Sequence, residues 1–524
     1  MKPDLSSPAS SADASPEQAS RPAAGAGGFV SWDILLPLLL AGYFLVNLLV
    51  RLTVSDSLEY DEAEQVLVTQ WLALGYATQP PLYNWLQHLV FSIGGISIAT
   101  LAIWKNTILF SLYLISWKTA KLLLPRKEHA AIATLGLLTI PQVAFESQRD
   151  LTHTVAVIFC AVLFLSGLFF TLKKPSLASY AITGLATGLG LLAKYNFALL
   201  PAAAFLAVLS HPQWRRRIFD RRFLLTAVLT VIVVAPHGWW LLQNLSVASQ
   251  GTLSKLQDTG ATATRFPFLE GLTSLVIAII GFAGLTILAY WIAFGRDFVA
   301  SLRAGGNDWT RFIERMLLAL AFVLILMLLV TGAEHIKDRW LAPLLVVLPL
   351  YLTLKLSAAG RLSETGARRF LTIALAVMVI IPTILGVRLH LPQWTGSYEK
   401  LNYPQRELVE RLVNEVGTRP GLLIANDSHI GGNMRLYLPD VPVYSIYFPA
   451  FQPKYEFSAQ RPILAVWNRR TADPLTLPDN LRPSIDRFAG AGARMKTGVV
   501  DVPYINGRPG DVYHLGYAVL YPAN

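Results

Sequence analysis

Carboxylates crowd the stretch that follows the first apolar run of this 524-residue chain. Five acidic residues fall within nine consecutive positions: Asp56, Glu59, Asp61, Glu62 and Glu64. Charged groups are costly to place beside a bilayer, so such a cluster favours a chemical role. A carboxylate held there could be a general base, a metal ligand or a helix-capping acid. Capping and solubility account for Asp56 and Glu59, whereas Asp61 and Glu62 could take any of these roles.

A second polar segment, ESQRDLTH, lies where two apolar runs meet. Arg149 and Asp150 stand in the break, and His153 begins the next run one turn further on, on the same side as Asp150. Arg149 and Asp150 could form a loop ion pair with no further role. Alternatively, the segment adds polar groups to the same cavity as the acidic stretch.

Cations interrupt the apolar runs at two later places. Lys194 and Tyr195 break the run GLLAKYNFALL. The lysine could snorkel to the membrane interface, or it could hold an anionic phosphate as a point charge. The segment EHIKDRW carries Lys337 and Arg339 and could equally be an ordinary interface loop or a site for a phosphate or lipid headgroup. His335 in that segment is an interface histidine or, as the alternative, a metal ligand.

A membrane-embedded scaffold must position these residues. The chain is 53% hydrophobic and 15% charged, whereas an average soluble domain has about 25% charged residues. A membrane span needs about 20 apolar residues, which predicts a polytopic α-helical protein with about eleven spans. The candidate spans are 32–52, 96–118, 129–145, 153–172, 177–193, 196–211, 223–242, 270–294, 315–332, 340–358 and 369–388. The single cysteine, Cys160, lies in an apolar run and excludes a disulfide framework.

The loops between these spans differ in charge. One alternating set is rich in Lys and Arg, and the positive-inside rule places that set in the cytoplasm. Its members are 125–129, 173–174, 211–222, 295–315 and 360–369. The net charge of +11 is therefore mainly a signal of topology rather than of nucleic-acid binding. The acidic stretch and the other polar segments then lie on the outer face, which is where we expect the chemistry.

The first outer loop, 55–95, is expected to form two short helices lying on the bilayer. Apolar spacing predicts a helix from Leu58 to Leu74. The segment around Gln79 and its two following prolines forces an extended kink, after which a second helix begins at Leu82. Tyr83 in that helix suits the membrane interface.

The ends of the chain differ from the middle. Residues 1–29 are rich in Ala, Ser, Pro and Gly and predict a disordered cytoplasmic tail. Residues 30–388 form the predicted transmembrane catalytic domain, and 389–524 predict a small soluble α/β domain outside the membrane. The expected helices there are 405–416 and 428–436, and the expected strands are 421–425, 441–447, 462–467 and 512–520. This segment contains no phosphate-binding glycine loop, nucleophile elbow or metal-spaced His/Cys set.

Four short motifs occur in a characteristic order. They are Asp61-Glu62-Ala63 after the first span, Pro80-Pro81-Leu82 before an aromatic helix, Leu192-Ala193-Lys194-Tyr195, and Arg339-Trp340-Leu341-Ala342-Pro343 before a late span. In this order the chain, over about residues 30–390, resembles the GT-C membrane glycosyltransferases. The branch it resembles is the protein O-mannosyltransferase-like superfamily, which includes the aminoarabinose and lipid A galacturonic acid transferases.

The resemblance implies sugar transfer, with inversion, from a polyprenyl-phosphate donor at an outward-facing site of a bacterial inner membrane. Asp61 resembles the catalytic acid of that family, and Lys194, Arg339, Lys337 and Arg149 are candidates to stabilise the lipid phosphate. Many relatives have His or Lys where this chain has Gln79, so a cationic contact to the donor is not expected there. Asp150 matches the second acidic position of the family imperfectly.

Several alternatives remain open from the sequence. A divalent metal could bind through Glu62 or His335, but nothing in the sequence requires one. The acceptor could be lipid A, lipopolysaccharide, another envelope glycan or a protein. A transporter would place ionisable groups in mid-span and show internal repeats, whereas here they lie at span ends. A catalytically inactive scaffold is a further alternative. Arg51, Lys255 and Arg265 are too isolated to be assigned a role.

Overall fold

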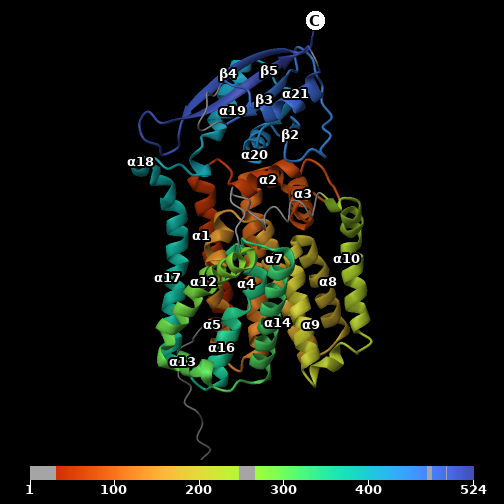
Figure 1. Cartoon of the computed structure of the whole chain (residues 1–524). Coiled ribbons are helices and arrows are strands. Elements are labelled where there is room, and N and C mark those ends of the chain that lie inside the picture. Colours follow the sequence, from red (N-terminus) through yellow and green to blue (C-terminus); the bar gives the residue numbers. More distant parts are fainter. Residues whose placement is uncertain (1–30, 247–265, 469–474, 491, 524) are drawn as a thin grey trace, which may run out of the picture.

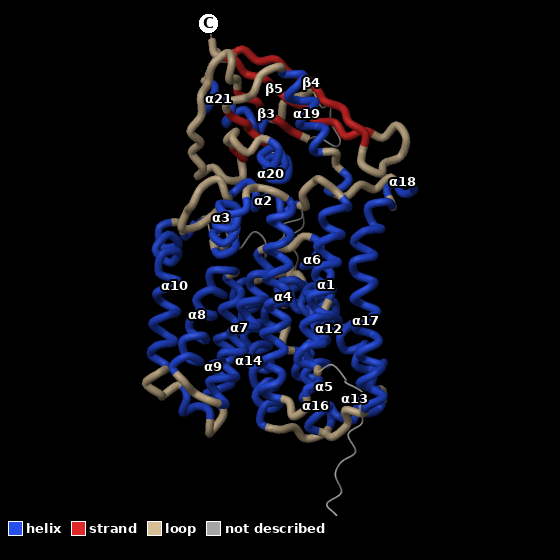
Figure 2. The backbone as a smooth tube through the Cα atoms, turned by 180° about the vertical axis from the view of Figure 1, so that it is seen from behind, coloured by secondary structure: helices blue, strands red, loops and turns tan. Residues whose placement is uncertain are grey.

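A computed structural model describes residues 31–246, 266–468, 475–490 and 492–523 of the chain. A bundle of long helices forms one part, and a five-stranded sheet with its helices lies at one end of the bundle (Figure 1). Seen from behind, the sheet again lies beside α2 and α3, at the end of the bundle opposite α13 and α16 (Figure 2). The predicted tail at 1–29 and the isolated Lys255 and Arg265 lie outside the described residues.

Ten helices of ten or more residues build the described bundle. They are α1 (Trp32–Val54), α4 (Ile98–Leu123), α7 (His153–Lys173), α8 (Leu177–Ala193), α9 (Leu199–Ser210), α10 (Phe223–Gln243), α12 (Pro267–Phe294), α14 (Asp308–Thr331), α16 (Leu348–Ala358) and α17 (Glu364–Val387). Shorter helices connect them: η3 (Tyr195–Ala198), η4 (Trp214–Arg217), α13 (Arg296–Arg303), η5 (Asp338–Trp340) and α15 (Ala342–Leu345). Three more lead from α17 to the C-terminal part: η6 (Arg388–His390), α18 (Pro392–Thr395) and η7 (Lys400–Asn402).

Apolar helices lie at the positions of the eleven expected spans, and seven or eight of them are long enough to cross a membrane. Within the described residues, seven helices are long and apolar enough to cross a membrane, namely α1, α4, α7, α10, α12, α14 and α17. Three of the remaining expected spans correspond to shorter apolar helices, Leu177–Ala193, Tyr195–Leu209 and Ala342–Ala358. The polytopic helical class expected from composition is thereby confirmed.

The expected span 129–145 is a bent pair of helices and not one continuous helix. α5 (Lys127–Leu135) and η1 (Gly136–Thr139) form its first half, while η2 (Gln142–Glu146, a π-helix) and α6 (Ser147–Arg149) form its second half. The two halves meet at an angle of 74°. Pro141 begins the second half, and its missing N–H and fixed ring break the helical hydrogen-bond ladder. The bend brings Asp150 to the turn that precedes α7.

The two short helices expected in the first outer loop are present. α2 (Tyr60–Val68) is shorter than the expected Leu58–Leu74, and α3 (Leu82–Gly94) begins directly after Pro81. A capping box starts α2, because the Glu59 carboxylate accepts from the N3 backbone while the Glu62 carboxylate accepts from the Glu59 N–H. Between the two helices the backbone is irregular, with a bridge between Tyr76 and Gln79.

The C-terminal part contains a mixed sheet in the order β2-β1-β3-β5-β4. Its strands are β1 (Leu422–Ala425), β2 (Val443–Ser445), β3 (Ile463–Trp467), β4 (Arg494–Pro503) and β5 (Val512–Tyr521). β1 pairs in parallel with β2 and β3, whereas β5 runs antiparallel to β3 and β4. The accompanying helices are α19 (Gln405–Val416), α20 (Ser428–Tyr437), η8 (Asp479–Leu481) and α21 (Arg482–Ala489). α19 has the expected bounds, while β4 and α21 were not expected.

Candidate functional site

Asp61 faces the turn between α6 and α7. Its backbone N–H donates to Asp150 Oδ1 at 2.9 Å, and its carboxylate Oδ2 accepts from the Thr152 N–H at 3.2 Å. Thr152 directly precedes α7, so Asp61 lies against the positive end of that helix dipole. The two acidic residues expected in one cavity are therefore in contact, through the hydrogen bond from the Asp61 N–H to the Asp150 carboxyl.

The two carboxyl groups differ in their surroundings. Burial raises the pKa of Asp150 well above its usual value, and the neighbouring Asp61 carboxylate raises it further. The raised pKa favours the neutral form of the Asp150 carboxyl. In its neutral form Asp150 adds no negative charge beside Asp61.

Glu62 is oriented away from this turn into a buried ion network. It is 1% exposed, and its carboxylate accepts from Arg51 of α1 at 2.7 Å and from Lys105 of α4 at 3.4 Å. Burial would raise the pKa of Glu62, but the two cations outweigh burial and lower the pKa to about 2. Both carboxylate oxygens are occupied by these bonds and by the Glu59 N–H. This geometry suits a residue that holds α2 in place rather than one that contacts substrate.

Lys194 binds the same helix start as Asp61. Its Nζ donates to Thr154 Oγ1 at 2.7 Å, two residues after the amide that binds Asp61. The next residues continue the contact chain, since Asn196 Nδ2 donates to the Trp340 carbonyl at 2.7 Å. The Lys194 turn is thereby joined to the segment that contains Arg339.

The segment before α15 carries exposed cationic side chains. His335, Lys337 and Arg339 are exposed, and in the part of the chain that the structure describes Arg339 forms no ion pair. Asp338 of the same segment accepts a hydrogen bond from Gln142 Nε2 of η2 at 2.6 Å. Contacts therefore run from Asp61 through α7 and Lys194 to this segment, and from there back to the bent helix that carries Asp150.

Arg149 lies apart from the Lys194 contacts. Its guanidinium is 3.7 Å from the Glu146 carboxylate and is partly exposed. It lines a small pocket of about 20 Å³ with Arg51 of α1 and Arg388, which follows α17. Neither Lys194 nor Arg339 lines that pocket. Arg149 is thus the one expected phosphate ligand that the contacts do not join to the others.

Aromatic and amide side chains pack beside Asp61. His153 Nε2 lies 3.3 Å from Gln65 Nε2, and the His153 ring lies 5.9 Å from the ring of Tyr83, which is buried. Tyr195 contacts His237 of α10 at 3.1 Å, and His237 Nδ1 donates to the Leu74 carbonyl at 2.7 Å. His153, Tyr83 and Tyr195 therefore pack around the α2–α3 segment, while Gln79 sits in its backbone bridge.

Metal ligands are not grouped in the described ranges. No set of three or more His, Cys, Asp or Glu side chains there could hold a metal ion. Glu62 has its oxygens taken by cations, and His335 is exposed.

Several residues of the site were not expected from the sequence. Arg51 and Lys105 pair with Glu62, while Thr152, Thr154 and His237 join the segments of the site. Lys105 was detectable, because an ionisable residue in the middle of an apolar helix signals a buried partner. Thr152 and Thr154 carry no such signal, because Thr152 contributes its backbone amide and threonine is common at helix starts.

Comparisons with known proteins show which family model and which proteins this chain resembles. The family model described as dolichyl-phosphate-mannose-protein mannosyltransferase matches residues 78–240. The chain is 45% identical over 489 residues to the lipopolysaccharide core galacturonosyltransferase RgtB of Rhizobium johnstonii, covering 93% of this chain and 97% of that protein. It is 41% identical over 488 residues to the lipopolysaccharide core galacturonosyltransferase RgtA of the same organism, again covering 93% and 97%.

A solved structure shares the fold. The crystal structure of ArnT from Cupriavidus metallidurans bound to undecaprenyl phosphate aligns with a TM-score of 0.57 and 12% identity, covering 93% of this chain and 98% of that chain. The helical bundle with its C-terminal sheet is thus the fold of a GT-C membrane glycosyltransferase.

The long, near-complete matches to RgtB and RgtA go further than the fold. The chain belongs to their family, in the ArnT-like branch of the GT-C enzymes, and is a multi-span membrane glycosyltransferase. The resemblance inferred from the four motifs is confirmed, and the transporter alternative is wrong.

Proposed function

We propose that this enzyme transfers a galacturonosyl residue from a polyprenyl-phosphate carrier to a hydroxyl group of the lipopolysaccharide core. The proposed identity of the sugar and the acceptor is supported by the 45% identity, along nearly the whole chain, to a protein named as a lipopolysaccharide core galacturonosyltransferase. The carrier is supported by the fold shared with ArnT, which was solved with undecaprenyl phosphate. The reaction takes place on the outer face of the inner membrane.

Asp61 is the proposed general base. As the acceptor oxygen attacks the anomeric carbon, the Asp61 carboxylate takes the hydroxyl proton, which can contribute about 10²–10⁴-fold to the rate. The bond between the anomeric carbon and the phosphate oxygen breaks, and its electron pair leaves with the lipid phosphate. Attack from the face opposite the phosphate inverts the anomeric centre. Asp150 and the Thr152 N–H hold Asp61 for this step.

Lys194 and Arg339 are the proposed ligands of the leaving phosphate. Developing negative charge is best stabilised by cations that are already in place before the reaction. Lys194 is held by Thr154 at the start of α7, beside the base. Arg339 is exposed and without an ion pair among the described residues, so its guanidinium is available to a phosphate. Lys337 extends the same cationic segment, with Tyr195 beside Lys194. Arg149 is left out of the proposed phosphate site because it lines a different pocket, and Glu62 is proposed to position α2 instead of acting on substrate.

The test combines a deletion strain with two matched substitutions. Asp61→Asn removes the base with little change of shape, and Asp56→Asn makes the same change five residues earlier, where Asp56 forms a partly exposed ion pair with Arg406. We expect mass spectrometry of lipopolysaccharide to show loss of one galacturonic acid in the deletion strain. Asp56→Asn should restore it, whereas Asp61→Asn should lower the rate of transfer in isolated membranes by about 10²–10⁴-fold.

Two outcomes would contradict the proposal. Near-normal transfer by Asp61→Asn would remove the base assignment. Unchanged core lipopolysaccharide in the deletion strain, with a glycan missing from an envelope protein, would instead assign the chain to protein O-glycosylation.

A further inference from the structure

The C-terminal sheet domain contacts the helix that carries the proposed base. The start of α2 is held at Leu58, whose N–H donates to Asn433 Oδ1 at 3.1 Å. The Leu58 carbonyl accepts from His429 Nε2 at 2.8 Å. Burial lowers the pKa of His429 to about 3, so its imidazole is neutral and its Nε2 carries the proton that it donates. Both His429 and Asn433 belong to α20.

The middle of α2 touches α20 backbone to backbone. A Cβ atom added at Gly432 would lie 2.1 Å from the carbonyl oxygen of Ala63, far inside van der Waals contact. Only glycine permits this approach, because every other residue carries a Cβ. Ala63 is fully buried and lies two residues after Asp61 on α2. A shift of α20 would therefore displace the turn of α2 that bears the base.

The end of α2 is held as well. Arg435 donates to the Val66 carbonyl and to Thr69 Oγ1. Gln70 and Val443 of β2 exchange two hydrogen bonds, at 2.8 and 2.9 Å. The following loop continues the contact, since Trp71 stacks on Phe451 with ring centroids 4.6 Å apart.

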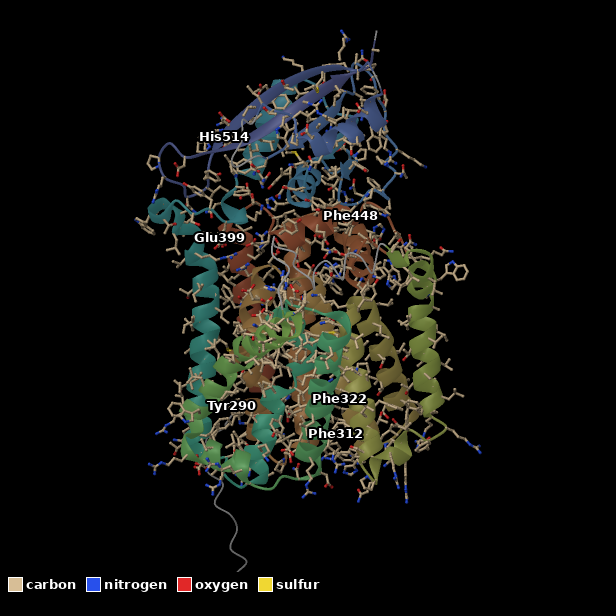
Figure 3. All side chains as sticks on the ribbon, in the orientation of Figure 1. Tyr290, Phe312, Phe322, Glu399, Phe448 and His514 are labelled. Carbon is tan, nitrogen blue, oxygen red and sulfur yellow. The ribbon has the colours of Figure 1, made fainter. Side chains whose placement is uncertain are left out.

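Apolar packing also joins α2 to the C-terminal sheet domain. Leu67 of α2 is 1% exposed and belongs to the hydrophobic core of the sheet, together with Leu423, Val443 and Met434. Phe448, on the side of the sheet domain that faces the bundle in Figure 3, packs against Trp71 with centroids 6.3 Å apart. α2 is thus part of the C-terminal core on one face and part of the proposed active site on the other.

We propose that α20 is a positioning element of the active site, in which Gly432, His429 and Asn433 hold α2 so that Asp61 stays on the turn before α7. The proposal rests on the proposed role of Asp61. None of these three residues contacts Asp61 in the structure, so they act through the α2 backbone. The C-terminal domain is then required for catalysis itself.

A pair of neighbouring glycines provides the sharpest test. Gly432→Ala drives a Cβ into the Ala63 backbone, whereas Gly431→Ala meets only side-chain atoms, the nearest being Leu67 Cδ1 at 3.2 Å. Both changes raise helix propensity equally. We expect Gly432→Ala to lower kcat by about 10²-fold at an unchanged KM for the lipid-linked donor, since a misplacement of about 1 Å has that effect. Gly431→Ala should keep wild-type kcat.

A second pair of variants distinguishes the loss of one hydrogen bond from general misfolding. His429→Gln retains an N–H that can reach the Leu58 carbonyl, whereas His429→Leu does not. We expect His429→Gln to keep most of kcat and His429→Leu to lose it, again at an unchanged KM. Equal kcat values for these two variants would argue against the positioning role.

Hydrogen–deuterium exchange of the purified full-length protein separates this inference from the proposed function. Amides of 58–70 should exchange faster in Gly432→Ala than in Gly431→Ala or the wild type. Unchanged exchange together with unchanged kcat in Gly432→Ala would overturn the inference. If the wild type transfers no galacturonic acid while exchange still responds to Gly432→Ala, the proposed function fails and α20 remains the holder of α2.

Discussion

Asp61 and Glu62 are neighbours in the chain but have opposite surroundings. Asp61 is partly exposed and binds the turn before α7, while Glu62 is enclosed by Arg51 and Lys105. Adjacent residues on a helix are rotated by about 100° from one another, so one residue of the pair can face the site while the other faces the bundle. The acidic pair thus divides into a proposed base and a residue that holds it.

The raised pKa of Asp150 predicts how the reaction depends on pH. Its pKa in the folded protein is raised above the unfolded value, so the stabilising contribution of the neutral form is present at low pH and is lost as pH rises through the raised pKa. Ionisation of Asp150 then adds a negative charge beside Asp61 and disturbs its position. We expect the wild-type transfer rate to fall on the alkaline side of its optimum, measured in membranes with lipid-linked donor in excess.

Asp150→Asn isolates this effect. The asparagine Oδ1 can still accept from the Asp61 N–H but has no proton to lose. We expect this variant to keep its rate across the pH interval in which the wild type declines, while Asp150→Ala is slower at every pH. An Asp150→Asn variant that declines in parallel with the wild type would assign the alkaline limb to another group.

At the scale of helices, Glu62 joins three elements. It lies on α2 and pairs with Arg51 of α1 and with Lys105 of α4. Lys105 also donates to the Gln148 carbonyl of α6, which carries the connection to the bent helix. The network therefore fixes α2 relative to three helices of the bundle.

Removing the Glu62 charge should weaken this junction. In Glu62→Gln the buried Arg51 and Lys105 lose their counter-charge, and breaking a buried ion pair from one side costs about 3–5 kcal/mol. We expect a lower unfolding temperature for the purified variant in detergent. Glu128→Gln, on an exposed position of α5, should leave the unfolding temperature unchanged. Equal unfolding temperatures for the two variants would show that the network does not stabilise the bundle.

The elements that could be predicted from the sequence are those with a repeating apolar pattern. α19 shows such a pattern and has its predicted bounds, and the long spans were recognised by apolar length alone. β4 has mostly exposed residues because it pairs with only one neighbour at the edge of the sheet, so its sequence lacks the strand signal. The 74° bend after η1 was missed because continuous apolar composition hides the break at Pro141.

For the site, sequence order could reveal the segments but not their partners. The motifs around Asp61, Lys194 and Arg339 were recognised, and contacts join all three segments through α7 and Asn196. Arg51, Thr154 and His237 could not be assigned, because their partners are distant in sequence and arise only from tertiary packing.

At the scale of the whole molecule, the basic loops and the sheet domain occupy opposite ends. α13, with its arginines, lies at the end of the bundle away from the sheet (Figure 1). The positive-inside rule then predicts a sheet domain on the outer side of the membrane.

Single cysteines can test this orientation. The native Cys160 is buried and can be changed to serine to give a cysteine-free background. Asp479→Cys places a thiol at a side chain that is 94% exposed in the sheet domain, and Lys127→Cys places one at the opposite end. We expect a membrane-impermeant maleimide to label the first in intact spheroplasts and the second only after permeabilisation. The reverse labelling pattern would invert the topology.

The contact between α2 and α20 also determines when the protein can complete its fold during synthesis. Leu58 and Asn433 are 375 positions apart, so the helix with the proposed base is synthesised early and α20, which contacts it, very late. A nascent chain whose bundle has fully inserted still lacks the partner for one face of α2. Long-range contacts of this kind form slowly and only after the intervening chain is in place. If α20 positions α2 as proposed, we expect no sugar transfer from a partly made or prematurely terminated chain.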